Sequence, residues 1–318
     1  MGFAEYFQAR EFVQGFQSYF LVALLFSSAL LAVLSILNKN KLAGGAIALN
    51  VIILLLGFLL LLWLHLKIYA SIELINPLNG ASMGRIMAPL WIENEKLYFW
   101  ALFLGFFTYH AYVRNKDRIF AKWLSIFFSG FVILTMLSSN PFSAPLPSLH
   151  QEISSYVQSL NSNNIYVAMQ SFQNFFGRVI YFYNSSYMWI HPPLLFISYA
   201  ALIASFLASI LMLAKKKDIY DKIAYSYAKL GYILLTVGML VSYPWALQAW
   251  ANEPWWWSPK INMSLMMWMF YTAYLHSRLH LHRRGMWNTT AILGIFCFGV
   301  LVLTYITTYL VPGVHSYG

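Results

Sequence analysis

Eight apolar segments near the length that crosses a lipid bilayer constrain this chain more than any other feature. A helix needs about 20 apolar residues to cross the hydrocarbon core. Only 9% of the residues are charged and the mean hydropathy is +0.61, so the chain lacks the polar side chains that cover a soluble globule. We therefore predict an all-α, polytopic membrane bundle that forms a single domain over residues 1–318. The segments lie at about residues 17–37, 43–66, 97–113, 123–138, 190–214, 226–246, 262–279 and 287–311.

Positive charges between these segments predict which side of the membrane each loop faces. Thirteen Lys or Arg residues fall in alternate loops that contain "NKNK", "RNKDRIFAK", "KKKDIYDK" and "HSRLHLHRR", whereas the opposite side has six. The positive-inside rule then places both termini outside the cytoplasm. We predict a multi-pass protein of the plasma (inner) membrane with an extracytoplasmic active face. Loop charges also account for the net charge of +10 without nucleic acid as a partner.

Residues 139–189 form the longer of two predicted outer segments. Polar and apolar residues alternate at roughly helical spacing in "HQEISSYVQSLNSNNIYVAMQSFQNFFGRVIYFY". This pattern predicts an amphipathic helix that lies on or near the outer surface.

Tryptophan is concentrated in one predicted outer loop, residues 245–260. Five of the 12 tryptophans fall within the thirteen positions of "WALQAWANEPWWW". Tryptophan also gathers where helices leave the bilayer, and Trp245, Trp268 and Trp287 fit such an aromatic belt. The remaining tryptophans of the loop predict an exposed aromatic surface for a large, flat, hydrophobic ligand, for which haem and quinone are the candidates. They are Trp250, Trp255, Trp256 and Trp257.

Two histidines border the same predicted outer face as the tryptophan loop. His191 lies at the outer end of the fifth segment, in "MWIHPPLLF", and His315 follows the eighth, in "VPGVHSYG". Pro192 and Pro193 suit the first turn of a helix, whose N-terminus disfavours a protonated imidazole at His191. A neutral imidazole is the form that ligates iron. Either histidine alone fits an ordinary interfacial residue, but two of them beside a flat aromatic surface predict a bis-histidine haem site.

A second pair of histidines lies deeper in the predicted bundle. His110 and His276 are each fourteen residues into their segments, so both are about 20 Å from the outer surface at about 1.5 Å per residue. Ionisable groups inside a membrane are candidates for function, and two facing neutral imidazoles can hold a b-type haem. The alternative is that both lie at the inner interface, bound to water or lipid headgroups. His65, near the outer end of the second segment, is a rival ligand.

Together these motifs give the chain a family resemblance over most of its length. It resembles the haem-handling membrane proteins of cytochrome c maturation that carry a tryptophan-rich "WWD" loop. The N-terminal half of the CcmF-type haem lyase subunit is the most similar, with features shared by the CcsA type. The resemblance is carried by "ASMGRIMAPLWIENEKLYFWALFL", "SSNPFSAPLPS", "MWIHPPLLFISYAAL", "WANEPWWWSPKINMSLMMWMFYTAYLHSRL" and "GVHSYG".

The resemblance implies which residues bind haem b and what is done with it. His191 and His315 correspond to the family's external ligands, and His276 corresponds to a transmembrane ligand of a second haem. The resemblance further implies that the bound haem is presented to the C-x-x-C-H thiols of apocytochrome c and that the chain acts as a haem lyase (cytochrome c synthase) subunit. Lys260 and then Arg178 are the predicted partners of the haem propionates. Other partners are a haem-delivery chaperone, further maturation subunits and a second membrane chain that completes the transmembrane site.

The chain departs from the family's loop pattern. Ser258 stands where that pattern has an aspartate, and Ile261 stands where an acidic residue often follows. The residues that follow in longer family members supply a second transmembrane histidine. Here a separate subunit supplies that ligand, or His110 does, or the internal haem is absent.

Three other classes of function stay open at this stage. A haem transporter or chaperone of the same superfamily uses the same surface and releases haem to a carrier. A quinol-oxidising b-type cytochrome uses the deep histidines for electron transfer. A structural membrane subunit that has lost an ancestral site would explain why Ser258 and Ile261 replace the acidic residues of the family pattern. No Ser-His-Asp, thiolate or paired-carboxylate arrangement points to other covalent chemistry, and the single Cys297 excludes a disulfide and a c-type haem motif within the chain.

Overall fold

The predicted helical architecture is confirmed. The computed structural model describes residues 2–114, 117–162, 164–249, 255–281 and 285–311, without the side chains of residues 308 and 309. Helices occupy all eight predicted segments: α2 (Gln17–Ile36), α3 (Asn40–Ser71), α4 (Glu95–Arg114), α5 (Arg118–Ser138), α8 (Ser186–Lys215), α9 (Asp218–Ala249), α10 (Pro259–Leu279) and α11 (Trp287–Leu310). Most extend past the apolar run at one or both ends, because hydropathy marks the part of a helix that meets lipid and not its full length.

The chain forms two compact units. Unit 1 comprises residues 1–105 and 127–189, and unit 2 comprises residues 106–126 and 190–318. Helices α4, α5 and α8 pass from one unit into the other, so no linker separates the units in sequence. The prediction of a single domain over residues 1–318 stays a prediction.

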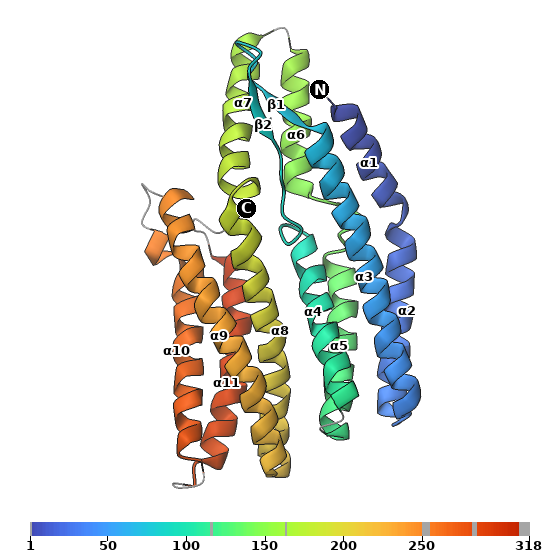
Figure 1. Ribbon diagram of the computed structural model, residues 1–318, viewed down its shortest axis with the longest axis vertical. Coiled ribbons are helices and arrows are strands. Elements are labelled where there is room, and N and C mark those ends of the chain that lie inside the picture. Colours follow the sequence, from blue (N-terminus) through green and yellow to red (C-terminus); the bar gives the residue numbers. More distant parts are fainter. Residues whose placement is uncertain (1, 115–116, 163, 250–254, 282–284, 312–318) are drawn as a thin grey trace. The chain divides into compact units, whose positions relative to one another are not determined.

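Unit 1 contains elements that the apolar pattern did not predict. Helix α3 packs against α1 (Phe3–Gly15) and α2 (Figure 1). After α3 the chain forms an antiparallel hairpin of β1 (Glu73–Ile75) and β2 (Ser82–Arg85). Residues 139–189 hold two packed helices, α6 (Pro147–Asn161) and α7 (Ile165–Arg178), then the π-helical turn η1 (Val179–Tyr183) and the first residues of α8. Both α6 and α7 bury one apolar side, as the amphipathic pattern predicted, but they are two helices and not one.

In unit 2, α10 packs against both α9 and α11 (Figure 1). The short 3₁₀ turn η2 (Trp255–Trp257) precedes α10 and contacts it. The tryptophan triplet is therefore held at the start of a helix and not in an extended loop.

Six helical segments among the described residues are long and apolar enough to cross a membrane, with α1 and α2 running together as one of them. Helices α4 and α10 are not among the six. These two helices carry the candidate deep histidines, His110 and His276. The chain is thus a polytopic, all-α membrane protein.

Pro192 and Pro193 do not lie in the first turn of their helix, and that prediction is wrong. Helix α8 begins at Ser186, which places both prolines inside it. Because Pro192 has no N–H, it cannot donate to the carbonyl of Met188 four residues earlier. The Trp91 indole N–H donates to that carbonyl instead. A side chain from another segment of unit 1 thus compensates for the interruption of α8.

Candidate functional site

His191 has the hydrogen bonding expected of a metal-ligating histidine. Its Nδ1 lies 2.8 Å from the backbone oxygen of Gly238 on α9. A carbonyl only accepts, so Nδ1 must carry the proton, and the lone pair of the neutral ring then resides on Nε2. Ligating histidines commonly donate their second N–H to a carbonyl in this way, which fixes the tautomer and the orientation of the ring.

Trp245 lies beside His191 and is not part of a lipid-facing belt. Its side chain is only 7% exposed, and its ring stacks on the imidazole with centroids 6.3 Å apart and planes inclined by 29°. The belt prediction for Trp245 is therefore wrong, because a belt tryptophan presents its ring to the interface. This tryptophan restricts the His191 ring from one face.

The three consecutive tryptophans have different environments. Trp255 makes edge contacts with Tyr243 of α9 and with Trp256, each at 5.7 Å between centroids. Trp256 and Trp257 are 53% and 71% exposed. Trp255 therefore anchors the turn, and its two neighbours supply the open aromatic area that the sequence predicted.

Ser258 ends this turn and starts the next helix. It is buried and occupies the N-cap position of α10, where its side chain makes no capping hydrogen bond, and Pro259 follows at the first helical position.

Of the other predicted outer residues, the structure describes Lys260 and Arg178 but not Trp250 or His315. Lys260 is half-buried on the first turn of α10, and its positive charge is close enough to His191 to disfavour protonation of the ring. Arg178 belongs to unit 1 and forms an ion pair with Glu152 at 2.9 Å. Trp250 and His315 lie outside the described residues, so the predicted second ligand has no structural description.

His110 and His276 lie close to the ends of their helices. His110 is four residues before the end of α4, and His276 is three residues before the end of α10. Both side chains are exposed, and His276 Nδ1 donates to the Thr272 carbonyl at 2.9 Å, which leaves the lone pair on Nε2. Their pairing across a haem stays a prediction.

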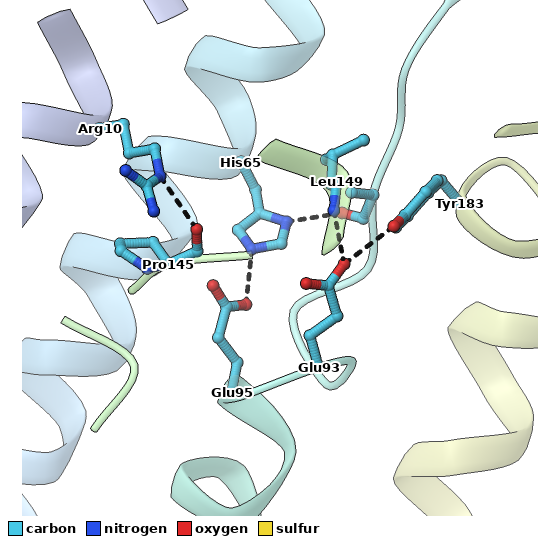
Figure 2. A network of polar contacts seen from close by, with 8 residues as sticks. Arg10, His65, Glu93, Glu95, Pro145, Leu149 and Tyr183 are labelled. Atoms are coloured by element: carbon cyan, nitrogen blue, oxygen red, sulfur yellow. Dashed lines mark hydrogen bonds and ion pairs between the residues drawn. The ribbon is translucent and has the colours of Figure 1, made fainter. Parts of the chain in front are cut away.

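His65 belongs to a buried network in unit 1 that sequence reasoning missed (Figure 2). Its Nδ1 donates to the Ala88 carbonyl and its Nε2 contacts Glu95 Oε2, both at 2.7 Å. His65 therefore has no ring nitrogen left for iron. The signal in the sequence was Glu95, an acidic residue directly before an apolar segment and therefore in need of a buried partner.

Glu93 occupies the other side of this network. It accepts from Ser148 N at 2.7 Å, from Leu149 N at 3.2 Å and from the Tyr183 hydroxyl at 2.8 Å. Burial raises the pKa of the Glu93 carboxyl, and these hydrogen bonds act in the opposite direction. The two amides belong to the first turn of α6, whose N-cap residue is Leu146, so Glu93 caps a helix from a distant loop.

The fold and this site define a class: a multi-pass helical membrane protein with a histidine and an aromatic turn brought together by three consecutive helices. A family model described as cytochrome C assembly protein matches residues 90–315. The chain belongs to this family, which the resemblance predicted.

Relatives agree with this assignment. The chain is 39% identical over 99 residues to the cytochrome c biogenesis protein CcsA of Thermosynechococcus vestitus, covering 31% of this chain and 30% of that protein. It is 34% identical over 149 residues to CcsA of Chlamydomonas reinhardtii, covering 42% of this chain and 41% of that protein. The chain thus spans less than half of the length of these relatives. No solved structure matches it.

Proposed function

We propose that this chain binds haem b at the extracytoplasmic face and presents it for covalent attachment to apocytochrome c. The main support is the hydrogen bonding of His191. Its Nδ1–H donates to the Gly238 carbonyl, so the lone pair of Nε2 is available to bind iron. The residues fit such a ligand. A neutral imidazole lies in the same unit as two exposed indoles, Trp256 and Trp257, which match a flat apolar ring system.

Each residue has a distinct part in this proposal. His191 would bind the haem iron, and His315 is proposed as the second ligand. Trp256 and Trp257 contact the porphyrin, with Trp250 proposed beside them, while Trp255 and Tyr243 fix the turn against α9. Lys260, near His191, is the proposed partner of a propionate. Arg178, which forms an ion pair with Glu152, is the second choice.

Bound haem supplies the two vinyl groups to which the cysteines of a C-x-x-C-H sequence add. In each addition the cysteine sulfur bonds to one vinyl carbon and the thiol hydrogen ends on the other. Among the described residues, the turn Trp255–Trp257 carries no titratable side chain, and the contribution proposed for the chain is to position the ligand and hold it at the surface. His276 is the proposed ligand of a second, transmembrane haem, with His110 or a second membrane chain completing it.

The proposed partners follow from this chemistry. They are apocytochrome c as the acceptor, a chaperone that delivers haem, and other maturation subunits of the plasma (inner) membrane. Cells that depend on this chain should accumulate a C-x-x-C-H reporter with covalently bound haem. His191→Ala should reduce that product to the level of cells lacking the chain, measured on denatured reporter that retains only thioether-linked haem.

A reporter whose cysteines are replaced by alanine is the matched control, because it accepts no thioether. A chain that retains haem when purified but gives no covalent reporter product, even with its partner subunits, would be a haem transporter or chaperone. Full maturation of the reporter by the His191→Ala variant would contradict the proposal.

A further inference from the structure

The hydrogen bond of His191 is one of three that are regularly spaced between α8 and α9. In each bond an α8 side chain donates to an α9 backbone carbonyl. Successive bonds lie seven residues apart on both helices, which is about two turns. We name this series the α8–α9 ladder. Its bonds are His191 Nδ1 to Gly238 O at 2.8 Å, Ser198 Oγ to Gly231 O at 2.7 Å and Ser205 Oγ to Ala224 O at 2.9 Å.

The ladder requires small residues on α9. A Cβ atom on Gly231 would lie 2.5 Å from Leu202 Cδ2, 2.7 Å from Leu202 Cγ and 3.1 Å from the Ser198 carbonyl oxygen. A Cβ atom on Gly238 would lie 2.9 Å from Leu195 Cδ2. Real Cβ atoms do not approach so closely, so the absence of side chains lets α8 and α9 come near enough for these bonds to form.

We propose that the α8–α9 ladder positions His191 as an iron ligand, with Ser198, Gly231 and Gly238 as positioning residues. The partner of His191 is a backbone oxygen, which no substitution can remove. Only the distance and register between the helices can change it, and the ladder sets both. The inference rests on the proposed function only in taking His191 as the ligand.

The test uses the full chain, first without haem and then loaded with it. In the haem-free protein, ¹⁵N NMR of labelled histidine should show His191 as the Nδ1–H tautomer, assigned by its absence in His191→Gly. Gly231→Ala should convert this signal to a mixture of tautomers, and Ser198→Ala should do so less completely. In the loaded protein, Gly231→Ala should weaken haem binding roughly tenfold to a hundredfold, as loss of such a partner does elsewhere.

Two control variants have the same chemistry away from the ladder. Gly299→Ala adds a Cβ where nothing lies within 4 Å, and Ser242→Ala removes a hydroxyl bonded only within α9, to Met239. Both variants should keep the Nδ1–H tautomer of His191 and the affinity for haem. Should Gly231→Ala fail to fold, Ser198→Ala and the milder Gly238→Ala carry the test. An unchanged tautomer in the ladder variants would overturn the ladder, whereas a changed tautomer with unchanged haem affinity would overturn His191 as the ligand.

A different observation concerns the buried pair of His65 and Glu95 in unit 1. One proton must lie between Nε2 and Oε2, because Nδ1 already carries the proton donated to Ala88. The Glu95 side chain is 0% exposed, and its other carboxyl oxygen, Oε1, has no hydrogen-bond partner among the described residues. An acceptor in this situation is destabilising unless a water molecule or other donor reaches it.

A buried hydroxyl lies near this carboxyl group. Tyr6 is within electrostatic range of both Glu95 and Glu93. Its hydroxyl contacts His150 Nδ1 at 3.2 Å, and His150 is half-buried on α6. The other charged groups around the pair are Arg10, which donates to the Pro145 carbonyl, and Glu93, which is hydrogen-bonded to Tyr183 (Figure 2).

From the buried Oε1 of Glu95, unpartnered among the described residues, we infer that His65 and Glu95 form a proton-binding site, and that Tyr6 and His150 lie on the route by which a proton reaches it. A proton that arrives at Oε1 leaves the Nε2–Oε2 proton in place, so the pair gains one positive charge. Glu93 favours that charge electrostatically.

Infrared spectra of the full chain in H₂O and D₂O test this site. The carboxyl band that Glu95→Gln abolishes should shift soon after transfer to D₂O. Tyr6→Phe should slow the shift, and Tyr156→Phe should not, because the buried Tyr156 hydroxyl donates to the Ile75 carbonyl away from the path. If Glu95→Gln does not fold, Glu95→Asp identifies the same band by its change of frequency. A band that does not respond to D₂O, or an unchanged rate in Tyr6→Phe, would overturn the inference.

Discussion

Three histidines differ in the ring nitrogens that their surroundings leave available. His191 and His276 each use Nδ1 to donate to a backbone carbonyl, whereas His65 uses both nitrogens. Iron needs one free nitrogen, so the first two keep the capacity to ligate and the third does not. Sequence position alone could not separate them, because all three lie within or beside apolar segments.

This difference gives a prediction for the deep histidines. His110→Ala should remove the contribution of the transmembrane haem from the low-spin b-type absorption spectrum of the isolated chain, because His276 alone cannot supply two imidazoles, while the contribution of the outer haem remains. His65→Gln should leave both contributions unchanged. A transmembrane contribution that persists in His110→Ala, or that arises only when a partner membrane subunit is added, would show that His110 is not the second ligand.

At the scale of helices, unit 1 is stabilised by carboxylates at the ends of α6 and α7. Glu93 contacts the first turn of α6 from a backbone φ of 47°, a left-handed conformation that few residues other than glycine take up. Hydrophobic periodicity predicted the amphipathic faces of α6 and α7, but it could not predict that the distant Glu93 would cap α6. The apolar runs similarly predicted α8 and α9, whereas the ladder between them depends on single serines and glycines.

Glu152 of α6 should make the stability of this region depend on pH. Burial raises the pKa of its carboxyl from 4.5 to about 7, although Arg178 opposes the change. A carboxyl whose pKa is raised by folding binds its proton more tightly in the folded state. Its protonated form therefore stabilises the folded state fully below about pH 4.5, and this contribution is lost as the pH rises through about 7.

Thermal unfolding of the purified chain measures this effect. The midpoint temperature of unfolding should decrease as the pH is raised from about 5 to about 8. Glu152→Gln should make this decrease smaller, because the amide does not titrate. An equally steep fall in Glu152→Gln would assign the pH dependence to another group.

At the scale of the whole molecule, the orientation in the membrane determines whether the aromatic turn can meet an extracytoplasmic apocytochrome. Loop charges predict that it does, but a helical bundle packs in the same way in either orientation, so the fold does not test this prediction. The structure instead shows where to place a probe. Ser258 is buried, whereas Trp257 is 71% exposed and the native Cys297 is buried.

Trp257→Cys should therefore react with a membrane-impermeant thiol reagent in intact cells, with the unmodified chain as the low-background control. A second cysteine at Asn79, on the exposed tip of the β1–β2 hairpin, is predicted on the same side and should react likewise. Labelling of both positions only after the cells are lysed would reverse the orientation.

The central claim is that His191 ligates haem, and imidazole rescue tests it most directly. His191→Gly should remove the low-spin haem spectrum of the outer site from the purified protein, and imidazole added during expression should restore it by occupying the vacated position. Gly238→Ala, which keeps the imidazole but disturbs its support, should lie between the unmodified chain and His191→Gly. An outer-site spectrum that is the same in His191→Gly as in the unmodified chain, with or without imidazole, would contradict the account.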